Sequence, residues 1–357
     1  MKRKGPLRVG FIGVGRPWRS AGATGFGMAY EHAAAYLALS NIRLAACADI
    51  RPENGRAFAE KTGTRAIYTD HRKMLRTEDL DMVSICVWPH LHAPLTIDAV
   101  RAGVKAVHCE KPMAESWGAS QRMAAVAKKH RARLTFNHQR RFGAPYRKMR
   151  DLAWAGRAGK ILRMEAACPN FYDWGTHWVD MLNMFNRETP AEWVMGQVDW
   201  RGGQVVFGVP CDSQGVFQIR YVNGVEGLVT TGGNRPDDCA LRMVGTEGII
   251  ELHWNEPILR LWRHGRKVEA IRVENELHGG SAIGKAVADA VNALRRGKMS
   301  ELGADNALRA TEIIFAGYES ARRRGRVDLP LRIKDNPLAA MIAARQLKAL
   351  GKPPTKR

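Results

Sequence analysis

The stretch Val9-Gly10-Phe11-Ile12-Gly13-Val14-Gly15 decides the fold of the first part of the chain. It is an apolar run, typical of a buried strand, that ends in a G-x-G turn. Glycines in such a turn let backbone amides approach a pyrophosphate group. Trp18 stands where a third glycine is usual, and the segment Arg16 to Met28 separates the turn from the next helix. We expect this segment to cover or flank the pyrophosphate.

A second predicted strand ends in Ala48-Asp49. An acidic side chain at this position can accept hydrogen bonds from the ribose diol of the cofactor, which favours NAD. Arg51 leaves NADP open, because a guanidinium group can pair with a 2′-phosphate. Asp49 lies farther from Gly13 than the usual spacing of about 20 residues, and the long segment after the turn accounts for most of the excess.

Strand-like and helix-like segments alternate over the first 135 or so residues. This order predicts right-handed crossovers and a doubly wound parallel sheet, a Rossmann fold. The expected strands cover Leu7 to Ile12, Ile42 to Ala48, Met82 to Val87, Ala106 to Cys109 and Arg133 to Asn137, and the expected helices cover Ala29 to Ala38, Pro52 to Lys61, Ala93 to Ala102 and Ser116 to His130.

After Asn137 the pattern changes to longer strands separated by tight turns. The pair Asn223-Gly224 predicts a hairpin, so we expect a second α/β domain with a largely antiparallel, open sheet. The predicted boundaries are 1–138 for the dinucleotide-binding domain, 139–335 for a substrate and oligomerisation domain, and 336–357 for a basic segment whose tail from Gly351 is expected to be mobile. Strands are expected at Ile161 to Ala167, Trp193 to Trp200, Val216 to Val222, Val225 to Thr230, Ala240 to Val244 and Ile258 to His264, and helices around Ile283 to Leu294 and Asp305 to Arg323.

The composition limits the class of protein. A net charge of +21 and a pI near 10.1 attract polyanions, but the basic residues are spread along the chain without helix-turn-helix or zinc-finger spacing. We therefore expect neither a specific nucleic-acid partner nor a membrane span. The six cysteines are widely spaced and form no C-x-x-C pair, which is typical of reduced thiols in a cytoplasmic protein.

Two further stretches carry a family pattern. They are Ser84-Ile85-Cys86-Val87-Trp88-Pro89-His90-Leu91-His92 and Val107-His108-Cys109-Glu110-Lys111-Pro112. Together with Asn137-His138-Gln139-Arg140-Arg141-Phe142 and Gly245-Thr246-Glu247-Gly248, they resemble the Gfo/Idh/MocA oxidoreductases, the glucose-fructose oxidoreductase and inositol dehydrogenase family. The similarities span nearly the whole chain.

This resemblance implies a nicotinamide cofactor held at the carboxyl ends of the Rossmann strands. It also implies which side chains and backbone groups hold that cofactor. They are Gly13, Val14, Gly15, Arg16, Asp49, Arg51, Val87, Pro89, His92, Glu110, Lys111 and Gln139.

The second catalytic motif of the family is matched by Asp173-Trp174-Gly175-Thr176-His177-Trp178-Val179-Asp180. If the segment is helical, Asp173 and His177 share one face, and Asp180 continues the stripe. A carboxylate beside an imidazole fixes its tautomer and raises its basicity, which suits removal of a hydroxyl proton. Lys111 would stabilise the negative charge that develops on the same oxygen. The expected reaction is oxidation of a secondary hydroxyl of a sugar, cyclitol or related polyol by hydride transfer.

Several alternatives stay open. Asp173, His177 and Asp180 could bind a metal ion together, although the sequence has no fourth ligand at a spacing typical of a metal site. The family also contains enzymes that keep NAD bound and cleave glycosidic bonds through transient oxidation. A binding protein of the same fold without turnover is the third alternative.

The stretch between Gly159 and Asp173 is shorter than in relatives, so the sequence does not indicate the substrate. Nearby tryptophans could stack on a sugar or lie in the core. We expect a homo-oligomer, a dimer or tetramer, because an open sheet leaves one face poorly covered.

Overall fold

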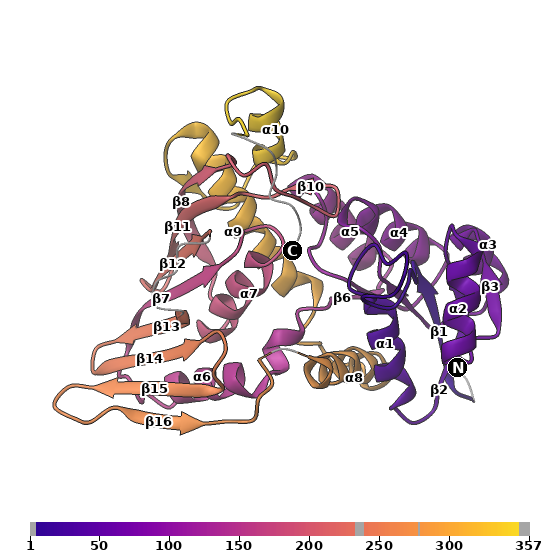
Figure 1. Ribbon diagram of the computed structural model, residues 1–357, viewed down its shortest axis with the longest axis horizontal. Helices are drawn as coiled ribbons and strands as arrows, with labels where there is room; N and C mark the ends of the chain where they lie inside the picture. The colour runs from indigo at the N-terminus through magenta and orange to yellow at the C-terminus, as the bar shows by residue number, and fades with distance from the viewer. Residues whose placement is uncertain (1–4, 233–238, 278, 350–357) are drawn as a thin grey trace. The chain divides into compact units, whose positions relative to one another are not determined.

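The computed structural model describes residues 5–232, 239–277 and 279–349 (Figure 1). The chain forms two compact units. Unit 1 comprises Met1–Ala114, Ala119–Gln139 and Gly280–Ala307, and unit 2 comprises Glu115–Gly118, Arg140–Gly279 and Leu308–Arg357. The segment 280–307 was expected in the second domain, so the units do not follow the predicted linear boundaries.

Unit 1 contains a six-stranded sheet in the order β3-β2-β1-β4-β5-β6, and every neighbouring pair is parallel. The predicted Rossmann fold is therefore confirmed. The central strand β4 is buried along its whole length, as expected for a sheet that helices cover on both faces. The strands are β1 (Leu7–Ile12), β2 (Ile42–Ala48), β3 (Ala66–Tyr68), β4 (Met82–Ile85), β5 (Ala106–Cys109) and β6 (Arg133–Phe136).

The helices of unit 1 follow the predicted crossovers, and β3 and α3 are additional elements that the sequence patterns did not predict. Helix α8 packs against α1, and its apolar stripe of Ile283, Val287 and Val291 completes the core of unit 1. Its amphipathic face was predicted correctly, but its placement in the second domain was wrong, because periodicity shows a buried face without naming the surface that covers it. The helices are α1 (Met28–Leu37), α2 (Pro52–Thr62), α3 (His71–Thr77), α4 (Pro89–Arg101), α5 (Trp117–Lys129) and α8 (Gly280–Arg296).

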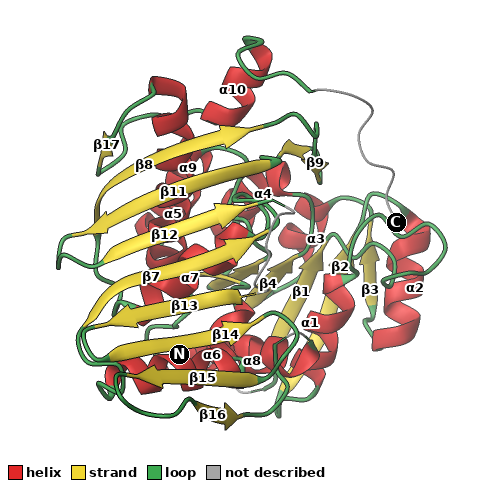
Figure 2. Cartoon of the chain, turned by 60° about the vertical axis from the view of Figure 1, so that its left-hand side comes forward, coloured by secondary structure: helices red, strands yellow, loops and turns green. Residues whose placement is uncertain are grey.

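Unit 2 contains a nine-stranded sheet in the order β16-β15-β14-β13-β7-β12-β11-β8-β17 (Figure 2). The pair β7 and β12 is parallel and all other neighbours are antiparallel, so the largely antiparallel sheet is confirmed. Gly224, with φ of 84°, closes the predicted hairpin between β11 and β12. The strands are β7 (Ile161–Cys168), β8 (Ala191–Asp199), β11 (Gln214–Tyr221), β12 (Glu226–Thr231), β13 (Cys239–Gly245), β14 (Gly248–His253), β15 (Ile258–Arg263), β16 (Glu269–Arg272) and β17 (Val327–Asp328), beside a two-stranded ribbon of β9 (Val205–Val206) and β10 (Val209–Pro210).

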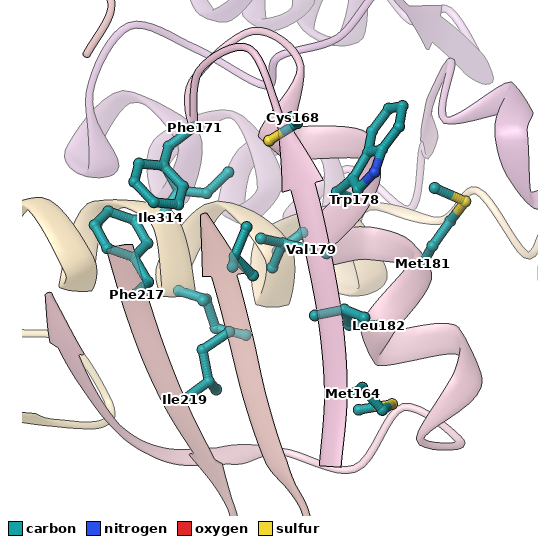
Figure 3. Close-up of a cluster of buried hydrophobic side chains, with 14 of the residues drawn as sticks. Met164, Cys168, Phe171, Trp178, Val179, Met181, Leu182, Phe217, Ile219 and Ile314 are labelled. Carbon is teal, nitrogen blue, oxygen red and sulfur yellow. The ribbon is translucent and has the colours of Figure 1, made fainter. Parts of the chain in front are cut away.

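Helices cover one face of this sheet (Figure 2). Between the helices and the sheet, Phe171 stacks on Phe217 with ring centroids 3.5 Å apart, and Val179, Leu182 and Ile314 pack beside them (Figure 3). Residues alternate between this core and the opposite face, as the burial pattern of β11 shows. The helices are α6 (Ala144–Trp154), α7 (Gly175–Phe185), α9 (Ala304–Arg323) and α10 (Pro337–Ala343), with a 3₁₀ turn η1 (Gln139–Phe142).

The C-terminal segment is only partly described. Helix α10 lies in the range predicted as a basic segment, whereas the predicted mobile tail from Gly351 lies outside the described residues. No helix in the described part of the chain combines the length and the apolarity that a membrane span requires.

Candidate cofactor and catalytic sites

The G-x-G turn follows β1 in unit 1. Gly13 has φ of 76°, and a Cβ atom there would lie 2.2 Å from Cγ1 of Val87. Gly15 has φ of 53°, and a Cβ atom there would meet no atom of the described residues within 4 Å. The first glycine is therefore required by packing, and the second leaves open space beside the turn. Both properties fit a pyrophosphate site.

Asp49 stands directly after β2 and faces this turn. Its Oδ2 accepts hydrogen bonds from the backbone amides of Val14, at 3.0 Å, and Gly15, at 2.9 Å. Its Oδ1 accepts from the Arg51 amide, at 3.0 Å, and from Nδ2 of Asn54, at 3.1 Å. Four donors thus fix the carboxylate at the place where the ribose of a dinucleotide is bound in Rossmann folds. The side chain of Arg51 is exposed beside it.

The long segment after the turn folds back on itself. A Cβ atom on Gly27 would lie 2.6 Å from the Trp18 backbone nitrogen, so the two ends of the loop touch. Trp18 and Phe26 are exposed, with ring centroids 6.2 Å apart. Burial raises the pKa of Tyr30 at the start of α1, while the nearby Arg16 guanidinium lowers it. Arg16 therefore lies near the helix that follows the turn, and its predicted contact with a cofactor stays a prediction.

The P-x-x-H motif forms the start of α4. Pro89 is the first residue of the helix, and His92 is fully buried. The ring nitrogens of His92 lie 2.7 Å from the Pro112 carbonyl oxygen and 3.0 Å from the Val87 carbonyl oxygen. Burial lowers the pKa of His92, so the ring is neutral and can donate only one of these bonds at a time. His92 therefore supports the turn around Lys111 from inside rather than presenting an exposed group to a ligand.

Glu110 follows β5 and is buried. Its Oε1 accepts hydrogen bonds from Nε2 of His32, at 2.9 Å, and Nδ2 of Asn137, at 2.7 Å. Its Oε2 lies 3.3 Å from the backbone amide of Lys111, which would donate to it. Lys111 itself is partly exposed at the carboxyl edge of the sheet. The motif therefore pairs a buried carboxylate with a lysine that is partly exposed.

Gln139 is the first residue of η1. Its Oε1 is buried and has no hydrogen-bond partner among the described residues. An acceptor in that state is available to a donor from a ligand, which is compatible with its predicted cofactor role.

Asp173 and His177 lie in unit 2. Asp173 belongs to the turn before α7, whereas His177 lies in the first turn of the helix. The condition that a single helix spans both residues is therefore not met. The side chain of Asn170 explains the difference, because its Oδ1 accepts hydrogen bonds from the amides of Asp173, at 2.8 Å, and Trp174, at 3.2 Å, and so holds a separate turn. Both Asp173 and His177 are buried.

Asp180 has a different role from the one its spacing suggested. It forms a bidentate ion pair with Arg141, with Nε to Oδ2 at 2.6 Å and Nη2 to Oδ1 at 2.7 Å. Within residues 5–232, 239–277 and 279–349, no group of three or more His, Cys, Asp or Glu side chains is arranged to hold a metal ion.

The tryptophans near this motif were expected either to stack on a sugar or to lie in the core, and they differ in burial. Trp178 is fully buried and stacks on Trp254, with centroids 4.7 Å apart, so it belongs to the core. Trp174 is only partly buried. The Arg140 guanidinium lies 4.5 Å from the Trp178 ring centroid and 5.4 Å from that of Trp174.

Sequence reasoning missed His32, Asn137 and Arg141 as supporting residues. The available signal was weak. His32 is a polar residue on the otherwise apolar, buried side of α1, and such a residue needs a partner inside the fold.

Comparisons with known proteins agree with this fold and these motifs. Residues 7–138 match the model of the Gfo/Idh/MocA oxidoreductases, described as an oxidoreductase family with an NAD-binding Rossmann fold. The chain carries the Rossmann domain of the Gfo/Idh/MocA oxidoreductase family. The resemblance seen in the motifs of this family is thereby confirmed, and so is the expectation of an NAD-binding domain.

Curated relatives align with part of the chain. The D-glucoside 3-dehydrogenase of Escherichia coli K12 is 30% identical over 156 residues, which cover 44% of this chain and 41% of that protein. The myo-inositol 2-dehydrogenase of Thermotoga maritima is 28% identical over 165 residues, which cover 46% of each. The matched segments therefore span less than half of these relatives.

Solved structures extend the likeness to both units. A levoglucosan dehydrogenase in complex with NADH and levoglucosan aligns with a TM-score of 0.77 at 21% identity, over 91% of this chain and 100% of that chain. The myo-inositol 2-dehydrogenase of Lactobacillus plantarum aligns with a TM-score of 0.71 at 22% identity, over 91% and 99%. At these identities the likeness shows a shared fold and nothing further.

Proposed function

We propose that this protein is an NAD-dependent dehydrogenase that oxidises a secondary hydroxyl of a sugar, cyclitol or related polyol. The observation that carries the proposal is Lys111, the second residue after β5, at the carboxyl edge of an NAD-binding Rossmann sheet. Ligands of open parallel sheets bind at that edge. The sugar and inositol dehydrogenases among the relatives support a ring hydroxyl as the reacting group.

Three side chains share the chemistry in this proposal. His177 removes the hydroxyl proton as general base, and Asp173 orients the imidazole and raises its basicity. Lys111 stabilises the negative charge that grows on the substrate oxygen. When bound, NAD supplies the acceptor for the hydride.

The residues of unit 1 fit a dinucleotide. The glycine turn has open space beside Gly15, and Asp49, held by the amides of Val14 and Gly15, stands where the ribose diol of a dinucleotide binds, which favours NAD over NADP. Arg51 is the residue that would serve a 2′-phosphate, so NADP use depends on its side chain.

The test uses purified protein with NAD or NADP and a panel of sugars, cyclitols and glycosides. Lys111→Ala and His177→Ala should each lower turnover by on the order of 100-fold while NAD still binds, and Asp173→Asn should cost less. Lys105→Ala is the matched control, because Lys105 stands at the opposite end of β5 and pairs with Asp81. Parent-level turnover in both the Lys111 and His177 variants would refute the proposed roles.

The same assay separates the alternative activities. NADH released in proportion to product supports a dehydrogenase. Glycoside cleavage without net NADH would instead indicate an enzyme that retains NAD and oxidises its substrate transiently. Cofactor binding without any turnover would indicate a binding protein of the same fold.

We also propose a cytoplasmic homo-oligomer, with the uncovered face of the unit 2 sheet as the contact surface. Met195 and Val216 are exposed on this face, beside Gln197 and Gln218. Such a mixed apolar and polar surface suits an interface between copies. Light scattering at micromolar concentration should give a dimer or tetramer mass, and Met195→Glu should reduce it; a monomeric parent would contradict the proposal.

A further inference from the structure

One carboxylate joins several segments of unit 1. Glu110, at the end of β5, accepts hydrogen bonds from His32 of α1 and from Asn137 directly after β6. His32 continues the chain to β4, because its Nδ1 lies 2.8 Å from Oγ of Ser84. The turn that carries Lys111 is thus tied to the helix that follows the G-x-G turn.

The connectivity Ser84–His32–Glu110 resembles that of a hydrolytic triad, but burial argues against that chemistry. Ser84 lies inside β4 and is fully buried, as is His32. A nucleophile must reach its substrate, and the Ser84 hydroxyl is buried within the sheet, where a substrate cannot contact it. The cluster must therefore act on its neighbours through charge and position.

His32 and Glu110 form an ion pair. Nε2 of His32 faces a carboxylate and must carry a proton, and Oγ of Ser84 can accept a hydrogen bond from a second proton on Nδ1. Burial lowers the pKa of His32, but Cys86 and Glu110 raise it to about 10. Burial raises the pKa of Glu110, but His32, Lys111 and Asn137 lower it to about 2. The other titratable groups that face the pair are Tyr36 on α1, Cys86 after β4, and His108 and Cys109 on β5.

We propose that His32 is a positioning residue for Lys111: it neutralises Glu110 and holds that carboxylate against the Lys111 backbone. The proposal rests on the catalytic role proposed for Lys111. Without the imidazolium, an uncompensated buried carboxylate would stand next in sequence to the lysine. Its field would hold the ammonium proton more tightly and offset the positive charge that Lys111 offers to a substrate oxygen.

The pair is built for this role by its surroundings. Each of the three donors to Glu110 comes from a different part of unit 1, so the carboxylate cannot turn toward Lys111 without losing at least two bonds. A merely structural histidine would need only a hydrogen bond. A neutral amide in its place could supply that bond but not the charge, which gives the two roles different consequences.

The test measures the titration of Lys111 without requiring turnover. Competitive labelling of the protein with acetic anhydride over a range of pH, followed by mass spectrometry of the Lys111 peptide, gives the pH at which this amine deprotonates. In His32→Gln this pH should rise by on the order of one unit. In His32→Gln/Glu110→Gln, which removes both charges and keeps a hydrogen-bonded pair, it should return to the parent value.

The control is His108→Gln, which removes an equally buried imidazole that bonds to Thr135 and not to Glu110. It should leave the Lys111 titration unchanged. An unshifted Lys111 in His32→Gln, or a double variant shifted as far as the single one, would overturn the proposal. Should His32→Gln not fold, Glu110→Gln serves alone: Lys111 should then deprotonate at or below the parent pH, and a rise would be contrary.

Turnover separates this inference from the proposed function. If the protein is a dehydrogenase, His32→Gln should lower kcat about tenfold at neutral pH, and the double variant should recover most of it. If the Lys111 labelling pH shifts in His32→Gln but the protein oxidises no polyol, the effect of His32 on Lys111 stands and the proposed function is refuted. If the protein oxidises polyols but the Lys111 labelling pH does not shift in His32→Gln, the proposed function stands and the role of His32 is refuted.

Discussion

Each unit supports its motif residues with a buried ion pair, and the two pairs differ in kind. In unit 1, Glu110 precedes Lys111 and pairs with His32, whose side chain is 0% exposed. In unit 2, Asp180 lies one turn of α7 beyond His177 and pairs with Arg141, with side chains 1% and 2% exposed. Both carboxylates belong to the motif that suggested a catalytic site, yet both face inward.

The difference lies in the cation. Arginine stays charged at any pH a protein survives, and its planar group matches a carboxylate with two parallel bonds. Histidine gains and loses its charge within the range of an experiment. Unit 2 therefore holds a fixed scaffold beneath α7, while unit 1 holds a charge beside Lys111 that pH and mutation can alter. Charged residues of a motif can thus serve the site without touching a ligand.

The largest effect should come from breaking the fixed pair. Arg141→Met would remove the ion pairs of Arg141 with Asp180 and with Glu188, which costs about 3–5 kcal/mol of unfolding free energy. Urea unfolding followed by tryptophan fluorescence measures it. In Arg141→Met/Asp180→Leu the two most buried charges are gone and Glu188, which is partly exposed, keeps Arg309 nearby, so much of the loss should return. If Arg141→Met were as stable as the parent, the Arg141 pair would contribute little to stability. The contrast between a fixed pair in unit 2 and a titratable pair in unit 1 would then be wrong.

The titratable pair should add a pH dependence that the Arg141 pair lacks. The pKa of His32 is raised from 6.5 to about 10, so its contribution is complete below pH 6.5 and is lost as the pH rises toward 10. The pKa of Glu110 is lowered from 4.5 to about 2, so its contribution is complete above pH 4.5 and is lost toward pH 2. The stability lost in His32→Gln should therefore be greatest between about pH 4.5 and 6.5 and should shrink toward pH 10.

Thermal unfolding of the parent and of His32→Gln from pH 4 to 10 provides the measurement. Arg141→Met serves as the comparison, because its loss should stay nearly constant between pH 6 and 10. A His32→Gln deficit that does not narrow at high pH would mean that His32 is neutral in the folded protein.

Much of the fold could be predicted from the sequence, for a physical reason. The bounds of β1, β2 and β5 were predicted to the residue, because short, mostly apolar runs between turns leave few other conformations. The strand β3 was missed, since it has only three residues and none of them is fully buried. Helix α8 was predicted as amphipathic but assigned to the wrong unit, because the partner of an apolar stripe is a tertiary property.

The candidate site was predicted to a similar depth. The G-x-G turn, Asp49 and Lys111 follow strand ends, so their place at the sheet edge follows from topology. The inward direction of Glu110, His92 and Asp180 could not be predicted, because it depends on partners far away in the sequence. The turn at Asp173 depends on a side-chain acceptor, Asn170, which competes with a longer α7.

The smallest effect should come from an exposed ion pair, which tests whether burial is what distinguishes the two pairs above. Arg157 and Glu269 lie in unit 2, with side chains 39% and 42% exposed and Nη2 to Oε2 at 2.8 Å. The bond is nearly as short as those of Arg141, so distance alone would predict a similar contribution. Water already solvates these charges and salt screens them, so Arg157→Met should cost less than about 1 kcal/mol and the cost should fall further in 0.5 M salt. Urea unfolding at low and high salt, beside Arg141→Met, measures both. A loss in Arg157→Met that equals the one in Arg141→Met and persists in salt would mean that geometry, rather than exclusion of water, sets the strength of these pairs.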